Sequence, residues 1–171
     1  RYRNDMFDTQ KKKSTEFLIP TVVVGNLNLG GSGKTPMVEF LIESFRDKYR
    51  LATLSRGYGR KSKGFLLAEP NLGPTDIGDE PFQIYSKFGK DVTVAVGEER
   101  VLAIPQIIFH RPKTELILLD DAFQHRYVKA DFNILLTTFQ NPFFKDKVLP
   151  LGTLRENAKG AKRADIIIVT K

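Results

Sequence analysis

The residues with the most specific chemistry are three glycines that precede a lysine and a threonine. Gly30, Gly31 and Gly33 are followed by Lys34 and Thr35, after the apolar run TVVVG and before an amphipathic stretch. Such glycines let the backbone curl until successive N–H groups point at phosphate oxygens, and a helix start adds the positive end of its dipole. In the P-loop motif the lysine bridges the β- and γ-phosphates and the threonine hydroxyl binds Mg²⁺. The pattern therefore predicts a nucleoside triphosphate site, against the alternative of a glycine-rich turn that binds nothing.

This predicted phosphate loop (residues 28–35) departs from the common motif at its first position. The pattern G-x-x-x-x-G-K-[ST] calls for glycine where this chain has Asn28. Asparagine tolerates left-handed backbone angles better than most residues, so the turn remains feasible. The residues expected to bind the nucleotide are Asn28, Leu29, Gly30, Gly31, Ser32, Gly33, Lys34 and Thr35.

A second apolar run, LILL, ends in Asp120 and Asp121. A carboxylate at the carboxyl end of a strand can lie near the metal of a nucleotide site, directly or through water. Either aspartate can fill this role, and the run alone is weak support because many buried strands end in aspartate. Together with the phosphate loop it predicts ATP- or GTP-dependent phosphoryl transfer or hydrolysis.

Elements that would hold these residues alternate along the chain. Nearly continuous apolar runs predict strands at 21–25, 51–55, 91–96, 115–120, 131–137 and 165–170. Apolar residues at helical spacing predict helices at 36–49, 81–88 and 98–109, the last of them kinked or ended by Pro105. Residues 57–74 are predicted to form a loop, with room for one short hairpin, and residues 139–164 a long functional loop around a helical turn. This order predicts an α/β fold of the P-loop NTPase type, with a mostly parallel layered sheet and helices on both faces.

The composition excludes several classes of site. The chain has 171 residues, 41% of them apolar, with no cysteine and a net charge of +7. It can bury a core, but a disulfide scaffold, a zinc ribbon, a thiol nucleophile and an iron–sulfur cluster are excluded. His110 and His125 are the only histidines, so a histidine-rich metal site is not expected. No apolar run approaches the ~18–20 residues that span a bilayer, so the chain as given reads as soluble. The charge would suit nucleic acid, but no stripe of aromatics interleaved with Lys and Arg is evident.

Five motifs occur in an order that resembles one family. They read VGNLNLGGSGKTP, LSRGYGR, GDEP, DDAFQHR and LPLGTLRE, between about residues 20 and 157, and together are similar to tetraacyldisaccharide 4′-kinases, the lipid A 4′-kinases of Gram-negative bacteria. The family's own phosphate loop lacks the usual first glycine, so Asn28 fits the resemblance. The resemblance implies transfer of the γ-phosphate of ATP, with Mg²⁺, to the 4′-hydroxyl of a tetraacyl disaccharide 1-phosphate. The alternative is another P-loop small-molecule kinase or a regulatory ATPase, which would turn over ATP without a lipid acceptor.

The resemblance also implies roles for individual residues. Asp79 corresponds to the proposed catalytic base, whereas the sequence alone favours a helix cap before Pro81. Glu80 would support Asp79 or lie near Mg²⁺, so Thr35, Asp120, Asp121 and Glu80 form the expected metal set. His125 could contact phosphate or orient Asp79 or Asp121, or it could be an ordinary hydrogen-bonded loop histidine.

Four arginines are candidates for binding phosphate groups. Arg155 lies in the last motif, and its planar guanidinium could neutralise charge in the transition state or hold the substrate phosphate. Arg56 and Arg60 flank Gly57 and Gly59 after a predicted strand, and they are candidates for binding the substrate. Arg100 has the weakest case, because its position suits a solvated helix face.

The resemblance divides the chain into a basic juxtamembrane-type segment (residues 1–16) and the N-terminal lobe of the kinase (residues 17–171). The family's membrane helix and C-terminal lobe are expected outside these residues. Arg1, Arg3, Lys11, Lys12 and Lys13 make the first segment basic, which would suit an anionic membrane surface. The expected partners are the lipid A precursor and the anionic surface of the inner membrane, on its cytoplasmic face. Nucleic acid is not an expected partner, and the protein is expected to be a monomer.

Overall fold

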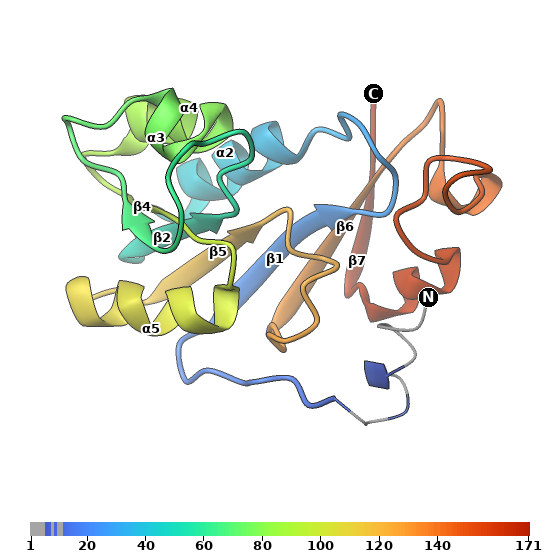
Figure 1. The fold of residues 1–171 in the computed structure, drawn as a ribbon, viewed down its shortest axis with the longest axis horizontal. Helices are drawn as coiled ribbons and strands as arrows, with labels where there is room; N and C mark the ends of the chain where they lie inside the picture. Colours follow the sequence, from blue (N-terminus) through green and yellow to red (C-terminus); the bar gives the residue numbers. More distant parts are fainter. Residues whose placement is uncertain (1–5, 8, 10–11) are drawn as a thin grey trace.

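The computed structural model describes residues 6–7, 9 and 12–171, and its centre is a seven-stranded sheet (Figure 1). The strands are β1 (Thr21–Asn26), β2 (Leu51–Ser55), β3 (Leu66–Leu67), β4 (Thr93–Val96), β5 (Leu116–Asp120), β6 (Phe132–Thr138) and β7 (Ile166–Thr170). Their order in the sheet is β3-β4-β2-β5-β1-β6-β7. The pairings are parallel except that of β3 with β4, so the predicted mostly parallel sheet is confirmed.

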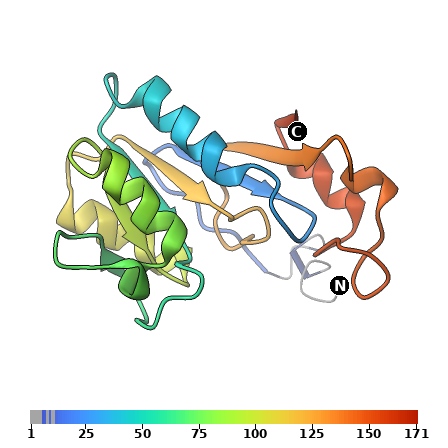
Figure 2. The ribbon, with the colours of Figure 1, turned by 90° about the horizontal axis from the view of Figure 1, so that it is seen from above.

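Helices cover both faces of the sheet, as predicted. They are α2 (Lys34–Phe45), α3 (Pro74–Ile77), α4 (Asp79–Phe88) and α5 (Arg100–His110), with 3₁₀ turns η1 (Phe143–Lys145) and η2 (Ala158–Arg163). Helices α2 and α4 lie side by side on one face, joined by an ion pair between Lys87 and Glu39, and α5 lies on the other (Figures 1 and 2). Among the described residues, no helix has the length and apolar character to cross a bilayer.

The continuous apolar runs of the central strands follow from burial on both sides. Val24 and Leu118 pack with α2 and α4, whereas Val23 and Leu119 pack with α5. Because successive side chains of a strand point to opposite faces, a strand covered on both faces needs apolar residues at every position.

All three predicted helices differ from the observed ones at one end or both, and two of these differences have a clear physical cause. Helix α2 begins at Lys34, two residues before Pro36, because Gly33 takes a left-handed conformation (φ 81°) and supplies the N-cap. Helix α5 does not end at Pro105 but continues to His110. Pro105 is exposed, and the lost backbone bond is outweighed by the buried face of the helix, which includes Ile104 and Ile107.

Candidate active site

The phosphate loop connects the carboxyl end of β1 to the start of α2, as its motif predicted. Gly30 (φ 105°) and Gly33 (φ 81°) adopt backbone angles that residues with a Cβ rarely take. Ser32 is 4% exposed, and its hydroxyl has no hydrogen-bond partner in the described part of the chain. The backbone therefore curls at the N-terminus of a twelve-residue helix, which is the arrangement that binds phosphate groups.

Lys34 is held between the side chain of Asn26, at the end of β1, and that of Asp121, just after β5. Its Nζ donates to Asn26 Oδ1 at 3.3 Å and lies 3.5 Å from Asp121 Oδ1. The Nδ2 of Asn26 donates in turn to the carbonyl of Asn28 at 2.8 Å. Asn26 thus joins the lysine to the phosphate loop, although sequence reasoning missed it; its one signal is a polar residue at the end of an apolar strand.

Asp121 brings Arg155 into the same cluster. The Nη1 of Arg155, which lies in the long connection between β6 and β7, is 2.9 Å from both carboxylate oxygens of Asp121. Asp121 itself has a positive φ of 47° in the turn that follows β5. The predicted site residues Lys34 and Arg155 therefore both contact Asp121, and we call these three residues the charge cluster.

Asp120 differs from Asp121 because it lies inside the protein. It is 7% exposed, and its Oδ1 has no hydrogen-bond partner among the described residues. The pKa of Asp120 is raised to about 7, first by burial and then by the neighbouring carboxylates Glu80 and Asp121, against the opposing effect of Lys34.

These residues fit a magnesium ion that is completed by other ligands. Within the described ranges no group of three or more His, Asp or Glu residues is placed to hold a metal by itself. Mg²⁺ usually binds one or two carboxylates together with substrate phosphates and water. The unpartnered oxygen of Asp120 suits this role, with Thr35 as the second residue of α2 and Glu80 close enough to affect Asp120.

Asp79 is the first residue of α4, and the helix-cap alternative for it is wrong. The N-cap of α4 is Gly78 (φ 93°), with no capping bond from a side chain. The side chains of Asp79 and Glu80 are exposed in the first turn. Both carboxylates are therefore open to solvent.

The remaining predicted arginines differ in their engagement. Arg60 donates to Glu98 Oε1 at 2.6 Å and to the carbonyl of Gly64 at 2.5 Å. Arg100 does not solvate a helix face: it is 3% exposed and donates to the carbonyls of Gly97 (2.7 Å) and Asp120 (3.4 Å). Burial lowers the pKa of Arg100 to about 10. Arg56 is exposed after β2.

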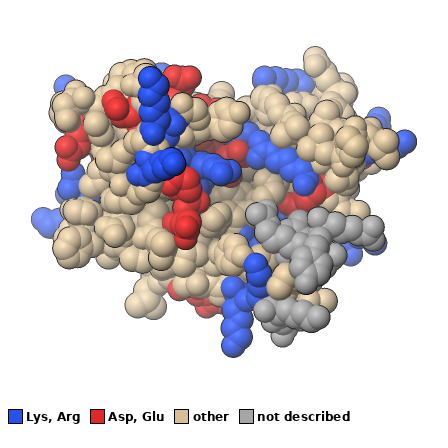
Figure 3. Space-filling model, viewed as in Figure 1, with Lys and Arg blue, Asp and Glu red and all other residues tan. Residues whose placement is uncertain are grey.

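On the face shown in Figure 3, Lys and Arg side chains lie across the middle with Asp and Glu side chains between them.

His125 lies in the turn after β5, where its ring centroid is 6.1 Å from that of Tyr127. His125 is four residues beyond Asp121 in the chain, and its role stays a prediction.

Sequence reasoning also missed a polar chain behind the charge cluster. Gln124 Nε2 donates to the carbonyl of Asn26 at 2.8 Å and to Glu156 Oε1 at 3.3 Å. Glu156 is 6% exposed and accepts from Arg163 at 2.6 Å. Gln124 and Glu156 belong to the motifs DDAFQHR and LPLGTLRE, and that membership is the signal that could have found them.

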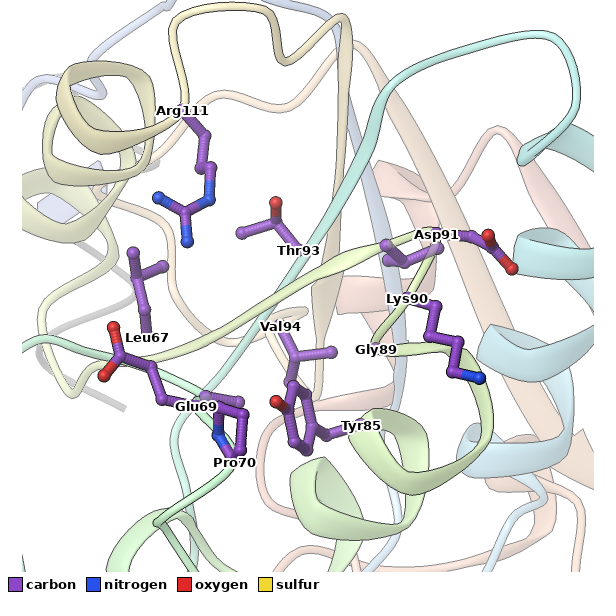
Figure 4. Close-up of a pocket in the computed structure, with 12 residues that line it drawn as sticks. Leu67, Glu69, Pro70, Tyr85, Gly89, Lys90, Asp91, Thr93, Val94 and Arg111 are labelled. Atoms are coloured by element: carbon purple, nitrogen blue, oxygen red, sulfur yellow. The ribbon is translucent and has the colours of Figure 1, made fainter.

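A separate hollow of about 370 Å³ lies away from the phosphate loop (Figure 4). Its lining comes from the end of β3 and the residues that follow it (67–70), the end of α4, the segment that leads into β4, and Arg111 after α5. Ligands of parallel sheets bind outside the carboxyl ends of the strands, and none of the predicted site residues lines this hollow.

The chain is similar to known proteins over nearly its whole length. The chain is 53% identical over 169 residues to the tetraacyldisaccharide 4′-kinase of Flavobacterium johnsoniae and 50% identical over 170 residues to that of Bacteroides fragilis. These matches cover 99% of the chain but 49% and 45% of the relatives, so the chain spans about half their length. The crystal structure of LpxK from Aquifex aeolicus in complex with ATP is 38% identical with a TM-score of 0.88, covering 99% of this chain and 53% of that one. The sequence model of the tetraacyldisaccharide-1-P 4′-kinase family matches residues 1–171, and the chain therefore belongs to that family.

Proposed function

We propose that the chain supplies the ATP-binding part of a lipid A 4′-kinase, which phosphorylates the 4′-hydroxyl of a tetraacyl disaccharide 1-phosphate. The observation that carries this proposal is the charge cluster of Lys34, Asp121 and Arg155 beside the phosphate loop. Phosphoryl transfer depends mainly on positioning the phosphates and neutralising their charge. Family and relatives are named for this reaction, and because the chain spans half of those relatives, we assign the activity to the complete gene product.

In this proposal the phosphate loop and the charge cluster bind the triphosphate of ATP. Backbone N–H groups of residues 28–35 donate to phosphate oxygens, and Lys34 exchanges Asp121 for the β- and γ-phosphates. Arg155 neutralises negative charge on the phosphoryl group as it transfers. Support comes from the burial of the Lys34 side chain, which is 10% exposed and so held beside the loop.

Mg²⁺ would be held by Asp120 and Thr35, with Asp121 and Glu80 near it. The bound ion would neutralise the charge that develops on the phosphates. Support comes from the unpartnered Oδ1 of the buried Asp120.

Asp79 is the proposed general base. Its carboxylate accepts the proton of the 4′-hydroxyl while that oxygen bonds to the γ-phosphorus, and the bond to the leaving ADP oxygen breaks. Its exposed place at the start of α4, beside Glu80, leaves it open to a large acceptor. His125 would orient a phosphate or one of the aspartates.

We further propose that the acceptor reaches this site from the cytoplasmic face of the inner membrane. Arg56, which is exposed, would bind the substrate, with weaker candidates in Arg60 and Arg100. Of the basic residues at the N-terminus, Lys12 and Lys13 are described, whereas Arg1, Arg3 and Lys11 lie outside the described residues. Such a segment would attract anionic lipids. The enzyme would act as a monomer, without nucleic acid.

The test is transfer of radiolabel from γ-labelled ATP to a tetraacyl disaccharide 1-phosphate by the complete gene product. We expect Lys34→Met to lower transfer at least about a hundredfold, and Asp79→Asn to lower it about 10²- to 10⁴-fold. The matched control is Lys87→Met, which removes a surface lysine that pairs with Glu39 and should leave the rate near that of the wild type. Undiminished transfer by either site variant would overturn its assigned role, and ATP turnover that ignores the lipid acceptor would favour a regulatory ATPase.

A further inference from the structure

The connection between β6 and β7 (residues 139–165) folds back along the phosphate loop. The N–H of Leu29 donates to the carbonyl of Thr153 at 2.7 Å, and the N–H of Arg155 donates to the carbonyl of Leu27 at 2.8 Å. Between them Asn28 and Leu154 form an antiparallel bridge. The shape of the phosphate loop and the place of Arg155 in the charge cluster are therefore fixed by the same short pairing.

Asp146 contacts both segments of this pairing through hydrogen bonds from Asn28 and Thr153. Its carboxylate accepts hydrogen bonds from Asn28 Nδ2 (3.0 Å), Asn141 Nδ2 (3.4 Å), the N–H of Lys147 (2.6 Å), the N–H of Thr153 (3.2 Å) and the Thr153 hydroxyl. The flanking Lys145 and Lys147 are exposed, whereas Asp146 is half-buried. These donors, with the Thr153 hydroxyl first, lower the pKa of Asp146 to about 2.

The same contacts give a physical reason for asparagine at the first position of the phosphate loop. The Nδ2 of Asn28 donates to Asp146 at 3.0 Å and to Thr153 Oγ1 at 3.3 Å, and Asn28 is 8% exposed. A glycine there would permit the turn but would leave the carboxylate of Asp146 without this donor. Asn28 thus ties the loop to a neighbouring segment, where a glycine would serve only the backbone.

We propose that Asp146 is a positioning residue for nucleotide binding: through Asn28 and Thr153 it holds the phosphate loop in the shape that binds ATP. Asp146 acts without touching the nucleotide, and the inference rests on the proposed function only in that the loop binds ATP. When the binding-competent shape is only partly populated, the apparent Kd rises in proportion. Loss of Asp146 should therefore weaken ATP binding more than it affects the acceptor.

The variant that tests this is Asp146→Asn in the complete gene product, because the amide has nearly the same shape but loses charge and one acceptor. We expect the Kd and KM for ATP to rise about tenfold or more, with the KM for the lipid acceptor unchanged. The matched control is Asp165→Asn: Asp165 likewise accepts from a backbone N–H and an asparagine side chain, those of Asn133 (2.7 and 3.3 Å), but at the opposite end of β6. It should keep the ATP affinity of the wild type.

A purely structural role would give a different result. In that case Asp146→Asn would lower the melting temperature as Asp165→Asn does, while ATP would bind the folded variant normally, and the inference would be overturned. If Asp146→Asn fails to fold, Thr153→Val removes one donor hydroxyl and should raise the Kd for ATP in the same direction by less. In a double-mutant cycle, the effects of Asn28→Ala and Asp146→Asn on the Kd for ATP should be non-additive, because both substitutions act on the same hydrogen bond between Asn28 and Asp146. Additive effects on the Kd would contradict the route through Asn28.

Failure of this inference can be told apart from failure of the proposed function. A wild-type protein that binds ATP but does not phosphorylate the disaccharide would overturn the function, while the Kd values would still decide the role of Asp146. A wild-type protein that phosphorylates the disaccharide, with Asp146→Asn equal to it in ATP affinity, would overturn the inference alone. A wild-type protein that binds no ATP would contradict both.

Discussion

Asp121 is the residue on which the charges of the site converge. Lys34 lies 3.5 Å from its carboxylate and Arg155 lies 2.9 Å from it. These contacts keep two long cationic side chains ordered before a ligand arrives, so the entropy of ordering them is lost on folding and not on binding. In the proposed function, phosphate oxygens that displace the carboxylate would meet donors already in place. Asp120 Oδ1, which has no hydrogen-bond partner among the described residues, would be left for the metal.

Asp146 should make stability depend on pH in the acid range. Its folded-state pKa of about 2 lies below the ordinary 3.8, so the ionised form stabilises the folded protein. That contribution is complete above the unfolded pKa and is lost as the pH falls through the folded one. We therefore expect the difference in urea midpoint between wild type and Asp146→Asn to be largest at about pH 5 and to narrow toward about pH 3.

Thr153→Val is the companion variant for this pH series. The Thr153 hydroxyl is the largest cause of the low pKa of Asp146, so its loss should move the acid-sensitive range upward. If the difference in urea midpoint between wild type and Asp146→Asn stays constant, or widens as the pH falls, the stabilising role of the Asp146 charge is contradicted.

The residues of the site were predictable to the extent that their contacts are local. The phosphate loop is contiguous in the chain, so its glycines, Lys34 and Thr35 were visible as a motif. Asn26 and Asp146 were missed because their roles depend on partners brought together by the fold: Asp146 lies 118 positions from Asn28 in the chain. No spacing rule links residues at such a distance.

At the scale of elements, the apolar runs predicted the long strands well and the exceptions have physical causes. Strand β3 has only Leu66 and Leu67, which is too short for a periodic pattern, and it pairs antiparallel at the edge of the sheet. Helix α5 passes Pro105 because tertiary packing overrides local propensity. Residues 139–164 were predicted as a loop around a helical turn, but their pairing with the phosphate loop could not be read from local sequence.

The start of α4 depends on Gly78. Its φ is 93°, and a Cβ there would lie 3.0 Å from the carbonyl oxygen of Tyr58 and 3.1 Å from Gly57. We expect Gly78→Ala to lower the free energy of unfolding by about 1–3 kcal/mol and to lower phosphoryl transfer, because Asp79 follows directly. Urea unfolding and the radiolabel assay would measure the two effects.

Gly59→Ala is the matched control for Gly78→Ala. Gly59 has a similar φ of 78°, but a Cβ there meets nothing within 4 Å, so it carries the backbone strain without the close contact. Gly78→Ala should be the more destabilising of the two. Equal losses would show that the contact with residues 57 and 58 does not set the position of α4.

At the scale of the whole molecule, the topology explains where the site lies. From β1 the chain crosses past β5 to β2, toward one edge of the sheet, whereas from the neighbouring β6 it passes to β7, toward the other edge. Connections that leave in opposite directions open a crevice at the carboxyl ends of the strands, and ligands of open α/β sheets bind there. The phosphate loop after β1 and the two aspartates after β5 meet at this point because β1 and β5 are neighbours.

The open side of this crevice leads to a prediction about the chain by itself. Asp79 and Glu80 are exposed, and the chain spans about half the length of its relatives. Phosphoryl transfer to an alcohol needs water excluded from the reacting phosphate, usually by closure of a second part of the enzyme. We expect the 171-residue chain to bind ATP, with a thermal shift that grows with ATP concentration, but to phosphorylate the lipid acceptor at least about a hundredfold more slowly than the complete gene product. Scanning calorimetry measures the thermal shift with ATP, and radiolabel transfer measures phosphorylation of the lipid acceptor. The complete Lys34→Met protein gives the background of the transfer assay. Turnover by the 171 residues that matches the complete protein would show that the site needs no closing part.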